Sequence, residues 1–112
     1  MNTIPYDVFE SVELRSGTVV KAEPFPKAKK PAFKVWVDFG PEIGILQTSA
    51  QITVHYTPQA LMGMQVIGCV NLGKKKIAGF ESEFLLVGFS DRSGDIHLAT
   101  FDPEIPNGQK LH

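Results

Sequence analysis

Glycine and proline, ten and eight in a chain of 112 residues, divide the sequence into segments of strand length. The clearest segment, residues 33–39, alternates apolar and polar side chains. Strict alternation has the two-residue period of a β-strand with one buried face. Lys34 and Trp36 are on the face that we expect to point outward. The face that we expect to be buried consists of Phe33, Val35, Val37 and Phe39.

Other segments predict a β-rich chain with one short helix. Thr57 as N-cap and Pro58 as first helical residue predict a helix that ends at Gly63. Gly17 interrupts the first strand and indicates a bulge or sharp bend there. A hairpin turn is expected at residues 91–94 and a further turn at Asn107. The remaining strands are expected at residues 12–22, 43–52, 64–72, 84–89 and 95–101.

About five main strands in so small a chain commonly close into a barrel, because closure removes exposed sheet edges. A helix between the third and fourth strands is the arrangement of an OB-fold, which we prefer to an SH3-like barrel. We therefore predict an all-β, five-stranded OB-fold barrel with one short helix between strands 3 and 4 and terminal extensions. A length of 112 residues allows one domain, residues 1–112.

The net charge of −1 excludes a histone-like protein that binds nucleic acid by bulk charge. No apolar run approaches the ~18 residues of a membrane-spanning helix, and residues 1–10 lack the basic start of a signal peptide. Cys69 lies in an apolar segment typical of a buried thiol. We expect a cytoplasmic protein that does not insert into membranes.

The sequence carries no recognisable catalytic motif. His55, His97 and His112 are scattered along the chain, and none adjoins another candidate ligand. Three or four convergent ligands are needed for a metal site, and no such spacing is found. Neither a nucleophile elbow nor a phosphate-binding P-loop is present. We expect no enzyme activity, no metal and no cofactor.

The lysines are clustered, and seven of the eleven basic residues lie in two short segments. Loops on one face of an OB-fold commonly bind nucleic acid, with lysines contacting the phosphates. The alternative is that the clusters are ordinary solvated loops. Trp36, on the outward face, is either a stacking residue or part of a subunit contact. The two clusters are Lys27, Lys29, Lys30 and Lys34, and Lys74, Lys75 and Lys76.

Residues 47–52 and 71–83 resemble the two signature stretches of the tRNA-binding domain family. The likeness runs nearly end to end for the CsaA subgroup of that family, with matching segments such as residues 9–18, 77–83 and 106–108. The resemblance implies an OB-fold without catalysis and tRNA recognition by shape. It also implies a homodimer whose terminal segments help to form the interface.

The same resemblance suggests which residues contact tRNA. Gly79 permits a turn after the lysine run, and alternate polar side chains of the first signature lie on one side of a strand. These polar groups either contact the ligand or satisfy loop backbone groups. The expected RNA-binding residues are Lys34, Gln47, Ser49, Gln51, Asn71, Lys74, Lys75, Lys76 and Ser82.

One departure from the family pattern follows Ser82. Many members continue with Gln-Gly-Met, whereas this chain has Glu83, Phe84 and Leu85, as the CsaA subgroup also has an acid and large apolar residues there. An acid beside a phosphate-binding surface weakens phosphate contacts by charge repulsion.

The CsaA likeness also leaves open a second function, that of an export-related chaperone. Such a protein would bind unfolded or precursor polypeptides and cooperate with the export machinery. Its apolar groove would be lined by Trp36, Phe80 and Phe84.

Overall fold

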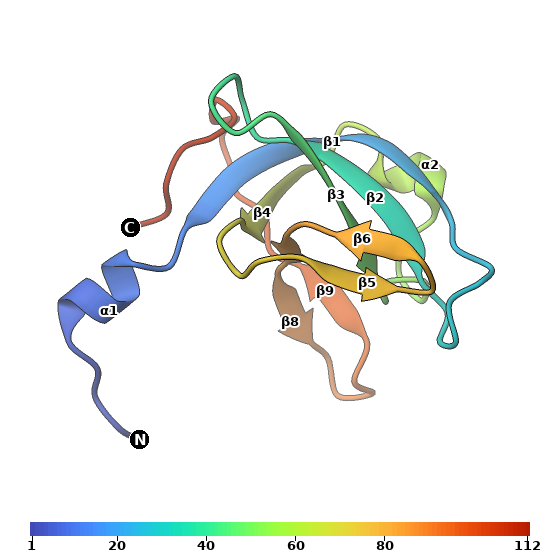
Figure 1. Cartoon of the computed structure of the whole chain (residues 1–112), viewed down its shortest axis with the longest axis horizontal. Helices are drawn as coiled ribbons and strands as arrows, with labels where there is room; N and C mark the ends of the chain where they lie inside the picture. The colour runs from blue at the N-terminus through green and yellow to red at the C-terminus, as the bar shows by residue number, and fades with distance from the viewer.

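A computed structural model describes all 112 residues, and its body is an antiparallel five-stranded sheet in the order β3-β2-β1-β4-β7 (Figure 1). The sheet curls until its edges meet. Glu83 N–H donates to the Gln47 carbonyl at 2.8 Å, and Thr48 Oγ1 donates to the Phe84 carbonyl at 2.7 Å. The result is the nearly closed OB-type barrel that the sequence predicted. Its strands are β1 (Leu14–Pro24), β2 (Phe33–Asp38), β3 (Ile45–Ala50), β4 (Gln65–Cys69) and β7 (Leu85–Leu86).

Strand β1 pairs with both β2 and β4, and its bulge lies between Val19 and Lys21. The bulge expected at Gly17 was therefore wrong in position. Gly17 has another role, because a Cβ atom there would lie 2.5 Å from Cγ1 of Val37. The glycine thus allows the inner face of β2 to approach β1 closely.

The core forms inside the barrel from the faces that alternation predicted. Val35, Val37 and Phe39 are fully buried, and Phe33 packs against them. Helix α2 (Pro58–Leu61) places the buried Leu61 in the same core. The Thr57 side chain accepts a hydrogen bond from Ala60 N–H at 3.1 Å, so the predicted N-cap is confirmed.

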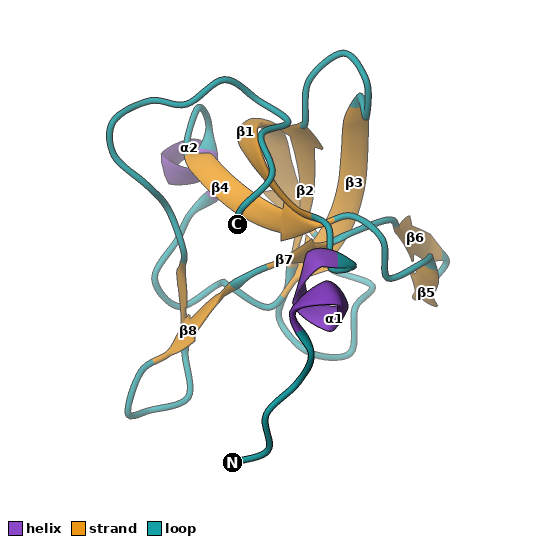
Figure 2. Cartoon of the chain, turned by 90° about the vertical axis from the view of Figure 1, so that its left-hand side faces the viewer, coloured by secondary structure: helices purple, strands orange, loops and turns teal.

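The predicted strand at residues 84–89 is divided between two sheets. Strand β7 belongs to the barrel, whereas β8 (Gly88–Ser90) pairs with β9 (Ile96–Leu98) in a separate hairpin. The predicted turn at residues 91–94 joins these two strands. Figure 2 shows β8 extending away from the barrel.

Two elements are absent from the sequence prediction. The lysine run is part of a hairpin formed by β5 (Lys75–Ile77) and β6 (Phe80–Ser82). A short helix, α1 (Tyr6–Glu10), lies outside the barrel (Figures 1 and 2). Neither helix of the structure is long and apolar enough to cross a bilayer.

Candidate nucleic-acid interface

The outer faces of β2 and β3 carry polar and aromatic side chains in register. Trp36 is opposite Gln47, and Lys34 is opposite Ser49. Trp36 Nε1 donates to Gln47 Oε1 at 3.2 Å, and Gln47 Nε2 donates to the Glu81 carbonyl at 2.9 Å. Gln47 therefore joins the barrel wall to the β5–β6 hairpin, which crosses in front of β2 and β3 in Figure 1.

An aromatic cluster with two lysines fills the space between the hairpin and the sheet. The Phe80 ring meets Phe25 and Trp36 edge-on, with centroids 5.5 and 5.9 Å apart. Lys34 Nζ lies 4.9 Å from the Phe25 centroid and 5.0 Å from that of Phe80. Lys21 Nζ lies 4.6 Å from the Trp36 ring. Cation–π contacts of this kind hold ammonium groups against an apolar support and leave their charge at the surface.

The two lysine clusters border separate, neighbouring hollows that have Ser49 and Ile77 in common. Lys74 and Lys75 line the one of about 280 Å³. The other, of about 350 Å³, separates the loop after β1 from the turn of the β5–β6 hairpin. Ile77 and Ala78 line it from the hairpin, and Ser49 and Gln51 line it from β3 and the residues after it. The loop contributes Lys27, Lys29 and Lys30.

We call the combined surface the basic face, and it holds eight of the eleven basic residues of the chain. Two acidic residues beside these lysines have partners of their own. Glu81 lies 3.5 Å from Lys74, and Glu83 Oε1 accepts the Gln47 N–H at 3.1 Å. Glu83, at which this chain departs from the pattern of many family members, thus helps to close the barrel. The basic face consists of Lys21, Lys27, Lys29, Lys30, Lys34, Lys74, Lys75 and Lys76.

Two further expected RNA-binding residues, besides Gln47, have structural partners. Ser82 is 8% exposed, and its Oγ accepts the Ser49 N–H at 3.0 Å. Asn71 accepts the Glu13 N–H at 3.0 Å and donates to the Ser11 carbonyl at 2.8 Å, so it holds the segment between α1 and β1. Both side chains satisfy backbone groups, which is one of the two roles that the sequence left open.

Phe84 does not belong to an exposed groove. It is 4% exposed and packs edge-on against Phe39, with ring centroids 4.9 Å apart. The expectation that it contacts a polypeptide is corrected, because the ring lies in the barrel core. Trp36 and Phe80 remain half-buried on the basic face.

Sequence reasoning missed Lys21 and Phe25, which complete the aromatic cluster. Lys21 is opposite Trp36 only because of the bulge in β1, and a bulge position is not visible in the periodicity. Phe25 lies between two prolines, outside the strands that the sequence predicts. Its aromatic side chain in a polar loop was the available signal.

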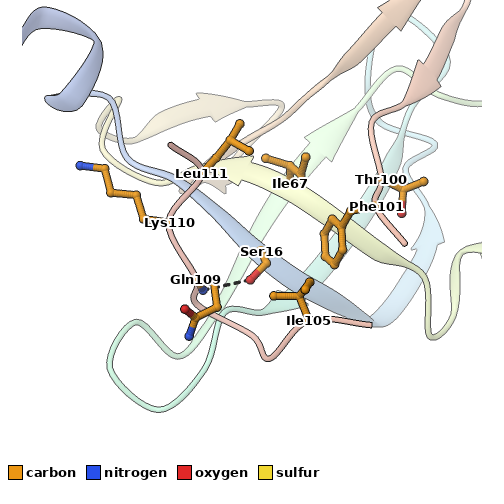
Figure 3. Close-up of a pocket in the computed structure, with 8 residues that line it drawn as sticks. All are labelled: Ser16, Ile67, Thr100, Phe101, Ile105, Gln109, Lys110 and Leu111. Atoms are coloured by element: carbon orange, nitrogen blue, oxygen red, sulfur yellow. Dashed lines mark hydrogen bonds between the residues drawn. The ribbon is translucent and has the colours of Figure 1, made fainter. Parts of the chain in front are cut away.

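A second feature lies at the C-terminal segment, where an apolar hollow of about 290 Å³ opens beside β1 and β4 (Figure 3). Ser16 Oγ accepts the Gln109 N–H at 2.9 Å and holds the segment in place. The apolar side chains that line the hollow are Ile67, Phe101, Ile105 and Leu111.

The sequence suggested that all three histidines are isolated, but two of them lie together in the structure. His55 and His97 stack with ring centroids 4.0 Å apart, and both contact Asp91. The distance between residues 55 and 97 along the chain concealed this cluster.

Comparison with known proteins agrees with this geometry. A family model described as a putative tRNA binding domain matches residues 14–110. The methionine–tRNA ligases of Methanocaldococcus jannaschii and Thermotoga maritima are 37% and 36% identical over 111 residues, which cover 99% and 98% of this chain. The chain spans only 17% of the length of each of these enzymes. It belongs to the tRNA-binding domain family.

Solved structures extend the likeness to the whole chain. The chaperone CsaA from Bacillus anthracis str. Ames is 41% identical with a TM-score of 0.92, covering 99% of this chain and all of that one. The CsaA chaperone protein from Picrophilus torridus is 35% identical with a TM-score of 0.91, covering 98% of this chain and all of that one. This protein is thus CsaA-like over its full length.

Proposed function

We propose that this protein is a non-catalytic tRNA-binding module of the CsaA type, which holds structured RNA on its basic face and acts as a cytoplasmic homodimer. The observation that carries the proposal is that the two lysine clusters border neighbouring hollows with Ser49 and Ile77 in common. The basic face holds eight basic residues although the whole chain has a net charge of −1. Such local concentration attracts a polyanion to one face of a nearly neutral protein.

The geometry favours recognition of RNA shape. Lysines of the loop line one hollow, and Lys74 and Lys75 line the neighbouring one, so they can reach phosphates on both sides of a backbone. Ser49 lines both hollows and Gln51 lines that of the loop, and both offer neutral groups to ribose hydroxyls. The aromatic rings beneath the lysines are held edge-on to one another and support the ammonium groups.

The test compares two single substitutions with the same change in charge. Lys75→Gln removes an exposed lysine of the basic face, and Arg92→Gln removes a cation from the β8–β9 turn outside it. We expect Lys75→Gln to weaken tRNA binding and to lower the slope of log K against log salt by about 0.9. Arg92→Gln should leave the slope unchanged. Equal effects of the two variants would contradict a localised site.

A second candidate function is binding of unfolded or precursor polypeptides for the export machinery. Two observations favour it: the similar CsaA structures are described as chaperones, and Trp36 and Phe80 are partly exposed among the lysines. Apolar contact persists or strengthens in salt, whereas phosphate contact weakens steeply.

Competition between the two ligands tests this candidate. An unfolded polypeptide should bind at salt concentrations that abolish tRNA binding, and at low salt it should displace tRNA, because Trp36 and Phe80 lie within the basic face. Simultaneous binding would place the polypeptide elsewhere on the molecule. Failure to bind polypeptide at any salt concentration would remove the chaperone function and leave the tRNA module.

A further inference from the structure

Three side chains far apart in sequence converge outside the basic face. His55 follows β3, Asp91 begins the β8–β9 turn, and His97 lies on β9. His55 Nε2 lies 2.8 Å and His97 Nε2 lies 3.0 Å from the same oxygen, Oδ2 of Asp91. The two imidazole rings stack nearly parallel, with an angle of 29° between their planes.

Backbone contacts fix the orientation of this cluster. Asp91 Oδ1 accepts N–H groups from Ser93 at 2.9 Å and Asp95 at 3.1 Å, which leaves Oδ2 directed at the histidines. Tyr56 Oη accepts the Leu98 N–H at 2.8 Å and so holds the residue after His55 against the residue after His97. The ligand atoms therefore meet because of the fold and not through flexible surface side chains.

We propose that His55, Asp91 and His97 form a binding site for one divalent transition-metal ion of the zinc type. Two imidazole nitrogens and one carboxylate oxygen are a donor set that Zn²⁺ prefers, and hard cations such as Mg²⁺ do not. The candidate ligand atoms all lie within 4.8 Å of one another. Tetrahedral zinc with bonds of about 2.0–2.2 Å separates its ligand atoms by roughly 3.3 Å, so small ring rotations suffice.

The charge of the cluster also suits a cation. Hydrogen bonds from His55, the Asp95 backbone and His97 hold the pKa of Asp91 well below its usual range, so its carboxylate is anionic at neutral pH. In the ion-free protein, two imidazole N–H groups share a single carboxylate oxygen. A divalent ion would take the place of both of these hydrogen atoms, with each neutral imidazole carrying its proton on Nδ1 instead, and would satisfy all three groups together.

Exposure indicates a site that remains accessible. The side chains of His55, Asp91 and His97 are 34%, 30% and 54% exposed, so an ion can enter and keep a water ligand. The consequence is structural. The β8–β9 hairpin extends from the barrel (Figure 2), and a bound ion would cross-link it to the segment after β3.

The experiment measures Zn²⁺ binding by titration calorimetry to the full, untagged chain after treatment with EDTA. We expect one Zn²⁺ per chain, and we expect His55→Gln and His97→Gln each to weaken binding by more than about tenfold. His112→Gln is the matched control, because the third histidine lies outside the cluster, and it should not change the affinity. No Zn²⁺ binding, or equal affinity in all four proteins, would overturn the proposal.

Two further measurements on the same samples keep the result independent of folding defects. Zn²⁺ should raise the Tm of the parent chain and of His112→Gln, but not that of the other two variants. NMR of the unsubstituted chain should show shifts in the ring signals of His55 and His97 and not of His112. A shift confined to His112 would place the ion elsewhere and refute the site.

Discussion

At the scale of single residues, Glu13 joins three segments of the chain. Its Oε1 accepts hydrogen bonds from Arg15 Nη2 at 2.6 Å and Nε at 3.0 Å, and its Oε2 lies 3.0 Å from Lys110 Nζ. Arg15 Nη1 also donates to the Gly108 carbonyl at 2.9 Å. This network holds the C-terminal segment against β1, close to the apolar hollow of Figure 3.

The hydrogen bonds from Arg15 and then Lys110 lower the pKa of Glu13 in the folded chain. A lowered pKa stabilises the fold above the unfolded-state value of about 4.3, and the contribution is lost as the pH falls through the folded value. We therefore expect Glu13→Gln to flatten the decline in the free energy of unfolding at pH values below about 4. Urea unfolding between pH 6 and pH 3 measures this slope.

Glu104→Gln is the control for that experiment, since Glu104 is exposed and forms no ion pair. It should keep the slope of the parent chain. If Glu13→Gln kept it as well, the network would contribute nothing to acid stability.

At the scale of elements, the β5–β6 hairpin carries the lysine run. Its two turn residues, Ala78 and Gly79, both have positive φ, at 49° and 80°. This backbone is that of the two-residue turns whose twist matches antiparallel strands. Glycine and asparagine accept it easily, whereas alanine does so at a cost.

We expect Ala78→Asn to strengthen the hairpin and Gly79→Ala to weaken it, by about 1 kcal/mol in the second case. No atom lies within 4 Å of a Cβ added at Gly79, so the effect is conformational and not a clash. Amide exchange of Ile77 and Phe80, the hydrogen-bonded pair that flanks the turn, should slow in the first variant and accelerate in the second. Unchanged exchange in Gly79→Ala would show that the turn does not limit the hairpin.

The elements that could be predicted are those with strong periodicity or specific end signals. The alternation of residues 33–39 located β2 and its buried face, and Thr57-Pro58 located α2. The β5–β6 hairpin was missed because its strands are three residues long and contain consecutive lysines. Strands β7 and β8 were predicted as a single strand, because the change from one sheet to another at Gly88 does not alter the hydrophobic pattern.

The candidate site was predictable in composition but not in arrangement. The lysine clusters and Gln47 could be identified from residue type and resemblance. Phe84 is apolar like Phe80, and only the fold shows that it points into the core while Phe80 points outward. The convergence of His55 with His97 depends on tertiary contacts between the segment after β3 and a separate hairpin.

At the scale of the whole molecule, the terminal segments expose apolar side chains. Tyr6 and Val8 of α1 are exposed, and so is Leu111, which is 47% exposed beside the hollow of Figure 3. Exposed apolar surface of this kind is typical of a protein–protein contact. Trp36, by contrast, is partly covered by Phe80 and Lys21, so it no longer supports a subunit contact.

We expect the chain to sediment at micromolar concentration with twice its mass of 12.3 kDa. Leu111→Asp should shift the population toward the monomer, because it places a charge in the proposed contact. Met62→Asp is the matched control, since Met62 is equally exposed at the end of α2. A monomeric parent chain would contradict the homodimer.

The central claim is that one tRNA contacts both lysine clusters of the basic face at the same time. The most direct measurement is the slope of log K against log salt for the parent chain and three variants. One variant replaces Lys27, Lys29 and Lys30 with Gln, one replaces Lys74, Lys75 and Lys76, and the third combines both sets. We expect each set to lower the slope by about two to three units and the combination by about five. A slope unchanged by either set would show that those lysines are only solvated and would contradict the claim.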